Sequence, residues 1–87
     1  MAFEYDPAKS DANKLKHGVD FDEAQALWDD PWRLDVPVKS DGEARILTVG
    51  RLKDRVWAAI WTPRNQDIRI ISVRRARKDE VYAYENI

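Results

Sequence analysis

One nearly continuous apolar segment reads Val56-Trp57-Ala58-Ala59-Ile60-Trp61-Thr62. An apolar run of this length between turn signals is typical of a strand at the centre of a sheet. After a polar loop at residues 64–66, residues 68–73 predict the last strand, with Ile68, Ile70 and Ser72 on one face. Its other face carries Arg69 among apolar neighbours. The two segments predict adjacent strands joined by a short loop.

Two further strands are predicted before this pair. Residues 34–38 alternate apolar and other side chains, and Pro37 places them near a sheet edge, because proline cannot donate to the hydrogen-bond ladder. A turn at residues 39–42 leads to a strand over 44–49, and a second turn is expected at 50–54. The four strands predict an antiparallel meander.

Helices are predicted on both sides of this meander. Asp6 and Pro7 mark a helix start, Gly18 marks its end, and three residues form its expected apolar face, namely Ala8, Ala12 and Leu15. Asp20 and Glu23 have capping-box spacing for a second helix that runs to about residue 29. The apolar stripe of this second helix is expected to be Phe21, Ala24, Leu27 and Trp28.

The remaining segments complete an α+β fold class. Residues 3–5 predict a short strand, and residues 78–85 predict a closing helix that packs through Val81 and Tyr84. The expected order is an N-terminal short strand and two helices, an antiparallel β-meander and a C-terminal helix. Because the chain has 87 residues, we expect a single domain over 1–87.

Composition excludes several classes of protein. The chain has no cysteine, which excludes a disulfide framework, a thiolate metal site and a cysteine nucleophile. It has no apolar run that approaches the roughly 20 residues of a membrane span and no basic, apolar leader. The sequence therefore predicts a cytoplasmic protein that neither binds nor crosses a membrane.

The formal net charge is −1, but the two halves of the chain carry net charges of opposite sign. Residues 1–43 carry five Lys or Arg and eleven Asp or Glu, whereas residues 44–87 carry ten and five. Six of the basic residues lie between positions 64 and 78, with Asp67 as the one acid, namely Arg64, Arg69, Arg74, Arg75, Arg77 and Lys78. Such a segment attracts a polyanion or an acidic partner, or pairs with the acidic half of the same chain.

Two sets of residues resemble the BrnT family of toxins. The first comprises Phe3-Glu4-Tyr5-Asp6-Pro7-Ala8-Lys9, Asn13, Lys16-His17-Gly18-Val19, Phe21 and Glu23-Ala24. The second comprises Trp61-Thr62-Pro63-Arg64, Ile68-Arg69-Ile70-Ile71-Ser72-Val73-Arg74-Arg75-Ala76, Glu80 and Tyr84-Glu85. With Asp30-Pro31 and residues 43–50, the match spans nearly the whole chain. Departures from the family pattern are Tyr5, Pro63, Val73, Arg75 and Arg77.

The resemblance implies a RelE-like fold and a toxin of a type II toxin-antitoxin system. It implies a metal-independent endoribonuclease that cleaves mRNA and arrests translation, with no cofactor. It also implies a BrnA-like DNA-binding antitoxin as partner, so that DNA is contacted only through the antitoxin. The rival hypothesis is a non-catalytic module of the same fold that binds RNA or protein.

Metal-free RNA cleavage needs proton transfer and a stabilised phosphate. The chain's one histidine, His17, is the candidate acid or base, although it can instead satisfy the last carbonyls of its helix. Arginine binds phosphate with two parallel hydrogen bonds, which selects Arg64, Arg69 and Arg74 as catalytic candidates. Candidate RNA-binding residues are Lys16, Arg75, Arg77, Lys78 and Tyr84.

Structural roles compete with several of these functional ones. Arg69 either meets a carboxylate such as Glu4 or Glu43 or opens into a groove. Tyr84 either stacks on a base or packs in the core, and the same alternative applies to Trp57 and Trp61. Trp28 and Trp32 are candidates for burial by the antitoxin. No Gly-rich phosphate loop, paired His ligands or Ser nucleophile elbow occurs, so the sequence does not predict nucleotide hydrolysis, zinc catalysis or acyl transfer, and no metal site is expected.

Overall fold

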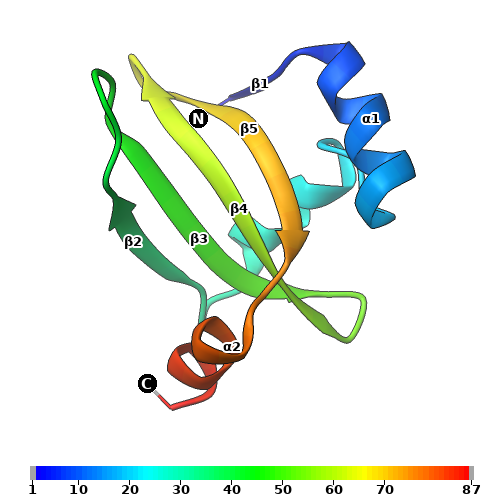
Figure 1. Cartoon of the computed structure of the whole chain (residues 1–87), viewed down its shortest axis with the longest axis vertical. Helices are drawn as coiled ribbons and strands as arrows, with labels where there is room; N and C mark the ends of the chain where they lie inside the picture. The colour runs from blue at the N-terminus through cyan, green and yellow to red at the C-terminus, as the bar shows by residue number, and fades with distance from the viewer. Residues whose placement is uncertain (1, 87) are drawn as a thin grey trace.

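A computed structural model describes residues 2–86. Its elements follow in the order β1 (Phe3–Glu4), α1 (Pro7–His17), η1 (Glu23–Asp29), β2 (Leu34–Val38), β3 (Arg45–Leu52), β4 (Arg55–Arg64), β5 (Asp67–Arg75) and α2 (Lys78–Glu85). The five strands form one sheet in the order β1-β5-β4-β3-β2 (Figure 1). The α+β class is confirmed.

The sheet confirms the predicted meander and adds one feature to it. Strands β2 to β5 pair antiparallel in succession, with β4 at the centre and β2, which contains Pro37, at one edge. The added feature is β1, which pairs parallel to β5 and places Phe3 beside Ile68 and Glu4 beside Arg69. The first strand therefore forms the other edge of the sheet.

Helices pack on both faces of the sheet, as Figure 1 shows for α1 and α2. The larger core lies between the sheet and the segment that runs from α1 through η1, and it is built from Val19, Phe21, Ala24, Leu27, Trp57, Ala59, Ile68, Ile70 and Val73. A smaller core joins α2 to the other face through Tyr84, Val49 and Ala58. Trp57 is buried and Trp61 packs against Trp28, so both tryptophans of β4 have the core role.

The predicted apolar face of α1 is wrong. Ala8, Ala12 and Leu15 are exposed, and Leu15 keeps 90% of its surface. The buried residues of α1 are Ser10 and Asn13. Their partners are backbone groups: Ser10 Oγ accepts from Phe21 N at 2.9 Å, and Asn13 donates to Val19 O at 2.7 Å and accepts from Val73 N at 3.2 Å. The helix docks through polar side chains because these bonds satisfy buried backbone groups.

The second predicted helix is a 3₁₀-helix rather than an α-helix. Its capping box is present, because Asp20 and Glu23 exchange backbone-to-carboxylate hydrogen bonds of 3.0 and 2.7 Å. Side chains three residues apart lie in line in a 3₁₀-helix. This spacing directs the row of Phe21, Ala24 and Leu27 into the core, where all three are buried.

The turn predicted at residues 50–54 is shorter than expected. Lys53 and Asp54 have φ values of 53° and 64°, which suit a tight two-residue hairpin with both central residues at positive φ. Gly50 is a buried strand residue, and a Cβ there would lie 3.4 Å from Leu27. Within residues 2–86, no helix is long and apolar enough to cross a membrane.

Candidate active site

The last turn of α1 places His17 at one end of the sheet. Gly18, at φ 89°, closes the helix by donating its N–H to Lys14 O at 2.9 Å. The backbone thus satisfies a terminal carbonyl. Asn13, one turn before His17, binds Val73 near the end of β5. The last turn of α1, which carries His17, therefore lies near the end of the sheet where β5 finishes.

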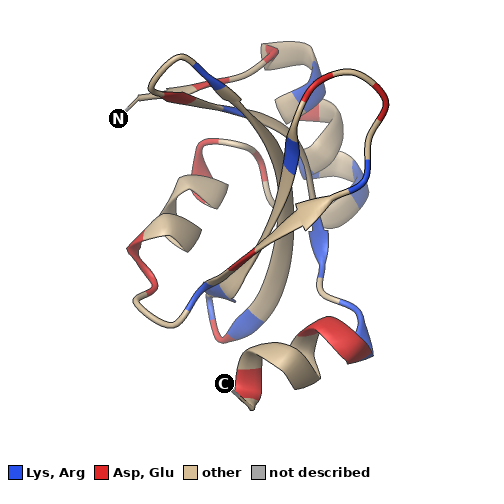
Figure 2. Cartoon of the chain, turned by 90° about the vertical axis from the view of Figure 1, so that its left-hand side faces the viewer, with Lys and Arg blue, Asp and Glu red and all other residues tan. Residues whose placement is uncertain are grey.

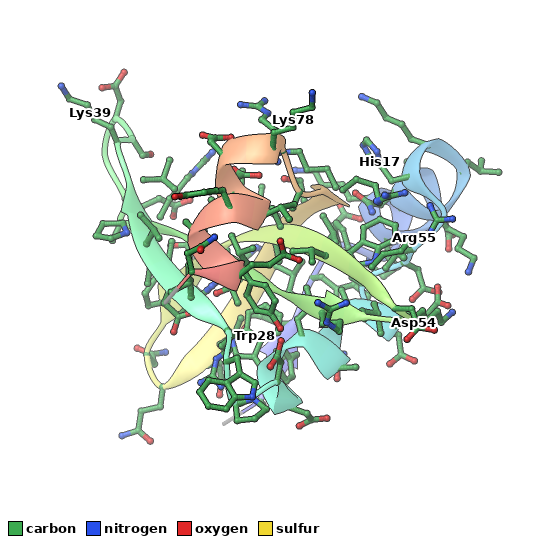
Figure 3. The ribbon with its side chains drawn as sticks, turned by 90° about the horizontal axis from the view of Figure 1, so that it is seen from below. His17, Trp28, Lys39, Asp54, Arg55 and Lys78 are labelled. Carbon is green, nitrogen blue, oxygen red and sulfur yellow. The ribbon has the colours of Figure 1, made fainter. Side chains whose placement is uncertain are left out.

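His17 is half-buried, and exposed Lys and Arg side chains from α1, β4, β5 and the start of α2 lie at the same end of the sheet. We call this set the basic end, which consists of Lys16, His17, Arg55, Arg75, Arg77 and Lys78. Figure 3 shows His17 on the same side of the molecule as Arg55 and Lys78. Figure 2 shows basic residues following the end of β5 into the link before α2. Sequence reasoning missed Arg55, because its position depends on the tight turn at Lys53 and Asp54.

Arg75 is the basic-end arginine on the sheet itself. It pairs with Trp57 across β4 and β5, and its guanidinium carbon lies 5.8 Å from the Trp57 ring centroid. Trp57 is held in turn by a 3.1 Å hydrogen bond from its indole N–H to Leu52 O. A cation above an aromatic face gains electrostatic stabilisation. Arg75 is nevertheless exposed, so its donors remain accessible to an anion.

Arg74 is bound by Glu80 instead of facing solvent. Its two terminal nitrogens donate to the two Glu80 oxygens at 2.7 and 2.9 Å. These hydrogen bonds raise the pKa of Arg74 and, against the effect of burial, lower that of Glu80. Glu80 also accepts from Arg77 N at 2.8 Å, which caps α2. Arg74 therefore fixes the start of α2 to the end of β5.

Arg64 and Arg69 lie at the opposite end of the sheet. Arg64 and Asp67 are opposite each other in the β4–β5 backbone ladder, next to the turn that joins the two strands. Arg69 and Arg75 are six positions apart along β5, which is about 20 Å at strand rise. The candidate arginines therefore do not all lie at the end of the sheet where His17 is found. Of the alternatives for Arg69, the structure shows a carboxylate partner, because its guanidinium lies 3.3 Å from Glu4 Oε1.

Tyr84 has the predicted core position. It is buried, and its hydroxyl donates to Asp30 Oδ2 at 2.5 Å. Burial and this hydrogen bond raise the pKa of Tyr84. The pKa of Asp30 is lowered despite the opposing effect of burial, because Tyr84 and the backbone N–H groups of Arg51 and Trp32 all donate to it. The Tyr84 hydroxyl is thus committed to an internal partner.

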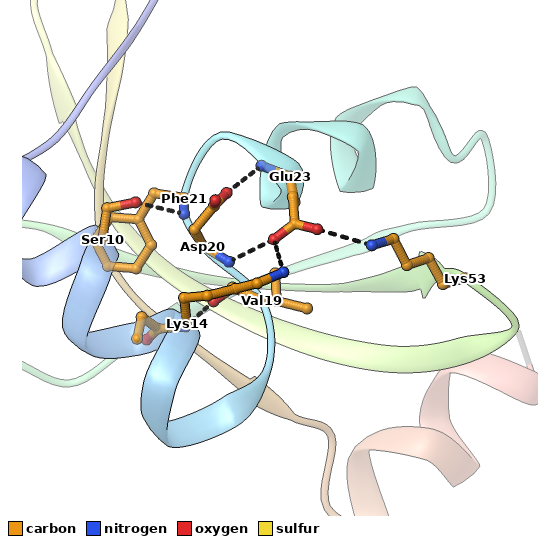
Figure 4. Close-up of polar contacts among 8 residues, drawn as sticks. Ser10, Lys14, Val19, Asp20, Phe21, Glu23 and Lys53 are labelled. Carbon is orange, nitrogen blue, oxygen red and sulfur yellow. Dashed lines mark hydrogen bonds and ion pairs between the residues drawn. The ribbon is translucent and has the colours of Figure 1, made fainter.

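Glu23 of η1 connects this helix to α1 and to the β3–β4 turn. Its carboxylate lies 2.7 Å from both Lys14 of α1 and Lys53 of the β3–β4 turn, and it accepts from Asp20 N (Figure 4). The hydrogen bonds from Lys14 and Lys53, followed by that from Asp20, lower the pKa of Glu23 to about 2. The ionised carboxylate therefore holds α1, η1 and the hairpin together.

The low pKa of Glu23 predicts acid sensitivity. A carboxylate with a depressed folded-state pKa contributes stability above its ordinary value of 4.5, and this stability is lost as pH falls towards 2. We expect the unfolding free energy of the wild type to drop more steeply between pH 5 and 2 than that of Glu23→Gln. At pH 7 we expect Glu23→Gln to lose about 1 kcal/mol, as for loss of a helix cap.

Urea unfolding at stepped pH values measures this difference. Asp11→Asn is the matched control, because Asp11 is an exposed carboxylate on α1, one of the segments that Glu23 connects. Its slope with pH is expected to equal that of the wild type. Parallel curves for Glu23→Gln and the wild type would contradict the linking role of Glu23.

The fold and the site define a small α+β protein that carries one histidine and several exposed cations at one end of its sheet. Among residues 2–86, no three His, Asp or Glu side chains are placed to hold a metal ion. A family model described as "Ribonuclease toxin, BrnT, of type II toxin-antitoxin system" matches residues 5–80. The chain belongs to this family of ribonuclease toxins, so an antitoxin is its partner. A search of curated proteins found no significant match.

Proposed function

We propose that this chain is an endoribonuclease that cleaves mRNA without a metal ion, arrests translation and uses the basic end as its active site. The observation that carries the proposal is the placement of His17 among exposed cations in a member of a ribonuclease toxin family. The α+β architecture with a central antiparallel sheet supports a RelE-like fold in one domain over 1–87.

The chemistry assigns proton transfer to His17. The ribose 2′-hydroxyl attacks the adjacent phosphorus, its proton leaves, and the 5′-oxygen of the next nucleotide departs with a proton. A histidine at the reacting phosphate carries these protons near neutral pH. Arg75 stabilises the additional negative charge, since a guanidinium stays charged and donates two hydrogen bonds.

The other candidate residues divide by position. Lys16, Arg77 and Lys78 bind the RNA backbone at the basic end. Arg74 acts as a positioning residue that orients the start of α2 through Glu80. Arg64 and Arg69, at the far end of β4 and β5, contact flanking phosphates of a longer RNA.

The proposed partner is a BrnA-like DNA-binding antitoxin that covers the basic end. Covering a cationic site with an acidic segment favours rapid association and blocks RNA at once. The affinity of this complex is expected to fall with added salt. Toxin and antitoxin meet in the cytoplasm, and DNA is contacted through the antitoxin.

Cleavage of single-stranded RNA in EDTA tests the proposal and locates the active site. We expect Arg75→Ala to lower the cleavage rate by ~10²–10³-fold, as for removal of a donor to a developing oxyanion. Arg64→Ala is the matched comparison, because it removes an exposed arginine at the other end of the sheet. On an RNA too short to reach Arg64, its rate is expected to stay within about threefold of the wild type.

A larger loss of cleavage rate in Arg64→Ala than in Arg75→Ala would place the active site at the Arg64 end of the sheet. RNA binding without any cleavage by the wild type would support the alternative, a non-catalytic binding module. Cleavage that needs an added metal ion would contradict the proposed chemistry.

A further inference from the structure

A surface pocket of about 440 Å³ is lined by Trp32, Arg51, Tyr84 and Glu85, none of which belongs to the basic end. Pockets that hold small organic ligands measure about 300–1,000 Å³. Trp32, with 70% of its surface exposed, belongs to the link between η1 and β2, whereas Tyr84 and Glu85 belong to the end of α2. Figure 1 shows α2 beside the start of β2, where these segments meet. An indole, a guanidinium and a carboxylate thus share one pocket.

One carboxylate, that of Asp30, binds the backbone of two lining residues and the side chain of a third. Its Oδ1 accepts from Trp32 N at 2.9 Å. Its Oδ2 accepts from Arg51 N at 2.9 Å and from the Tyr84 hydroxyl at 2.5 Å. The Arg51 guanidinium lies 5.8 Å from the Tyr84 ring centroid, a cation–π distance. The fold therefore fixes the Tyr84 side chain and the backbone positions from which Trp32 and Arg51 reach the pocket.

The side chains of this pocket match the edges of one nucleobase. An indole offers a face on which a base stacks. Arginine donates to the O6 and N7 acceptors of guanine. A glutamate carboxylate accepts hydrogen bonds, and guanine presents N1–H and the N2 amino group side by side as donors. Adenine lacks the O6 acceptor and has an acceptor at N1, which a carboxylate repels.

We propose that this pocket binds a guanine base of the RNA, with Trp32 stacking on the base, Arg51 donating to its O6 and N7, and Glu85 accepting from N1–H and N2. The inference rests on the proposed function, because it makes the pocket a specificity subsite of the same ribonuclease. Tyr84 and Lys78 are six residues apart on α2, about 9 Å along the helix. An RNA strand at the basic end thus has a neighbouring base near the pocket.

Glu85 explains why the ligand is a base rather than a phosphate. A carboxylate beside Arg51 repels a phosphate group, whereas it adds two hydrogen bonds to a neutral guanine. The basic end, which holds several cations, binds the phosphates instead. The basic end therefore binds the RNA backbone, and the pocket recognises the base.

Binding of guanosine 5′-monophosphate, followed by calorimetry, tests the pocket without any cleavage. We expect it to bind at least tenfold more tightly than the adenosine, cytidine and uridine monophosphates. Trp32→Ala is expected to weaken binding by on the order of tenfold or more through loss of stacking. Glu85→Gln is expected to remove most of the preference for guanine. Tyr82→Ala is the matched control, because Tyr82 is an equally exposed aromatic side chain on α2 outside the pocket.

The outcomes separate this inference from the ribonuclease proposal. If the wild type binds guanosine 5′-monophosphate selectively but does not cleave RNA, the guanine site is supported and the ribonuclease proposal is rejected. If the wild type cleaves RNA but binds the four nucleotides with equal affinity, the guanine assignment is overturned and the ribonuclease proposal stands. Unchanged affinity in Trp32→Ala would likewise overturn it. Binding of an antitoxin peptide at Trp32, with no nucleotide bound, would assign the pocket to a protein partner instead.

Discussion

Asn13→Ala is expected to lower the free energy of unfolding by about 2–6 kcal/mol. The Asn13 side chain donates to Val19 O and accepts from Val73 N, and it is itself buried. Each buried backbone group left without a partner costs about 1–3 kcal/mol. The substitution deprives two such groups, one in the α1–η1 link and one in β5. It also removes a tie between α1 and the sheet.

Urea unfolding followed by tryptophan fluorescence measures this loss. Leu15→Ala is the matched control, since Leu15 lies on the same helix with 90% of its surface exposed. Its expected change is within about 0.5 kcal/mol, as for other exposed positions. A larger loss for Leu15→Ala than for Asn13→Ala would show that α1 docks through the apolar face predicted from the sequence.

The sheet was predictable because its strands have strong local signals. The alternation in β2, the apolar run in β4 and the turn residues between them define four antiparallel strands. The parallel pairing of β1 was not predictable, since a two-residue strand carries no information on its partner. Its place depends on β5, more than sixty residues later in the chain.

The docking face of α1 could not be predicted from hydrophobicity. A periodic pattern assumes that apolar residues face the core, which fails where a helix caps backbone groups instead. Ser10 and Asn13 are buried because Phe21 N, Val19 O and Val73 N need partners there. Those partners come from a loop and a distant strand, neither of which the local sequence of α1 reveals.

The candidate site shows a related limit of sequence reasoning. Arg64, Arg69, Arg74 and Arg75 form one charge cluster in the sequence, but a strand spreads them over both ends of the sheet. Two of them also have ion-pair partners, Glu4 and Glu80. Charge density along the chain therefore predicted a basic surface but not which arginines would share it.

Replacing His17 with alanine is expected to lower the rate of RNA cleavage by ~10²–10⁴-fold, the usual contribution of a general acid or base. The loss is expected in the rate at saturating RNA, because the cations of the basic end still bind the backbone. The fold is expected to persist, since Gly18 rather than His17 closes α1. Cleavage of a labelled oligonucleotide and unfolding by urea measure the two properties separately.

Lys9→Gln is the matched control for His17→Ala. Lys9 is an exposed cation in the first turn of the same helix, away from the basic end, and its loss is expected to leave the cleavage rate within about twofold. Added imidazole is expected to restore part of the activity of His17→Ala, because a free imidazole can carry the proton in the vacated position. If folded His17→Ala cleaves RNA at the rate of the wild type, His17 is not the proton carrier, whatever the arginine variants show.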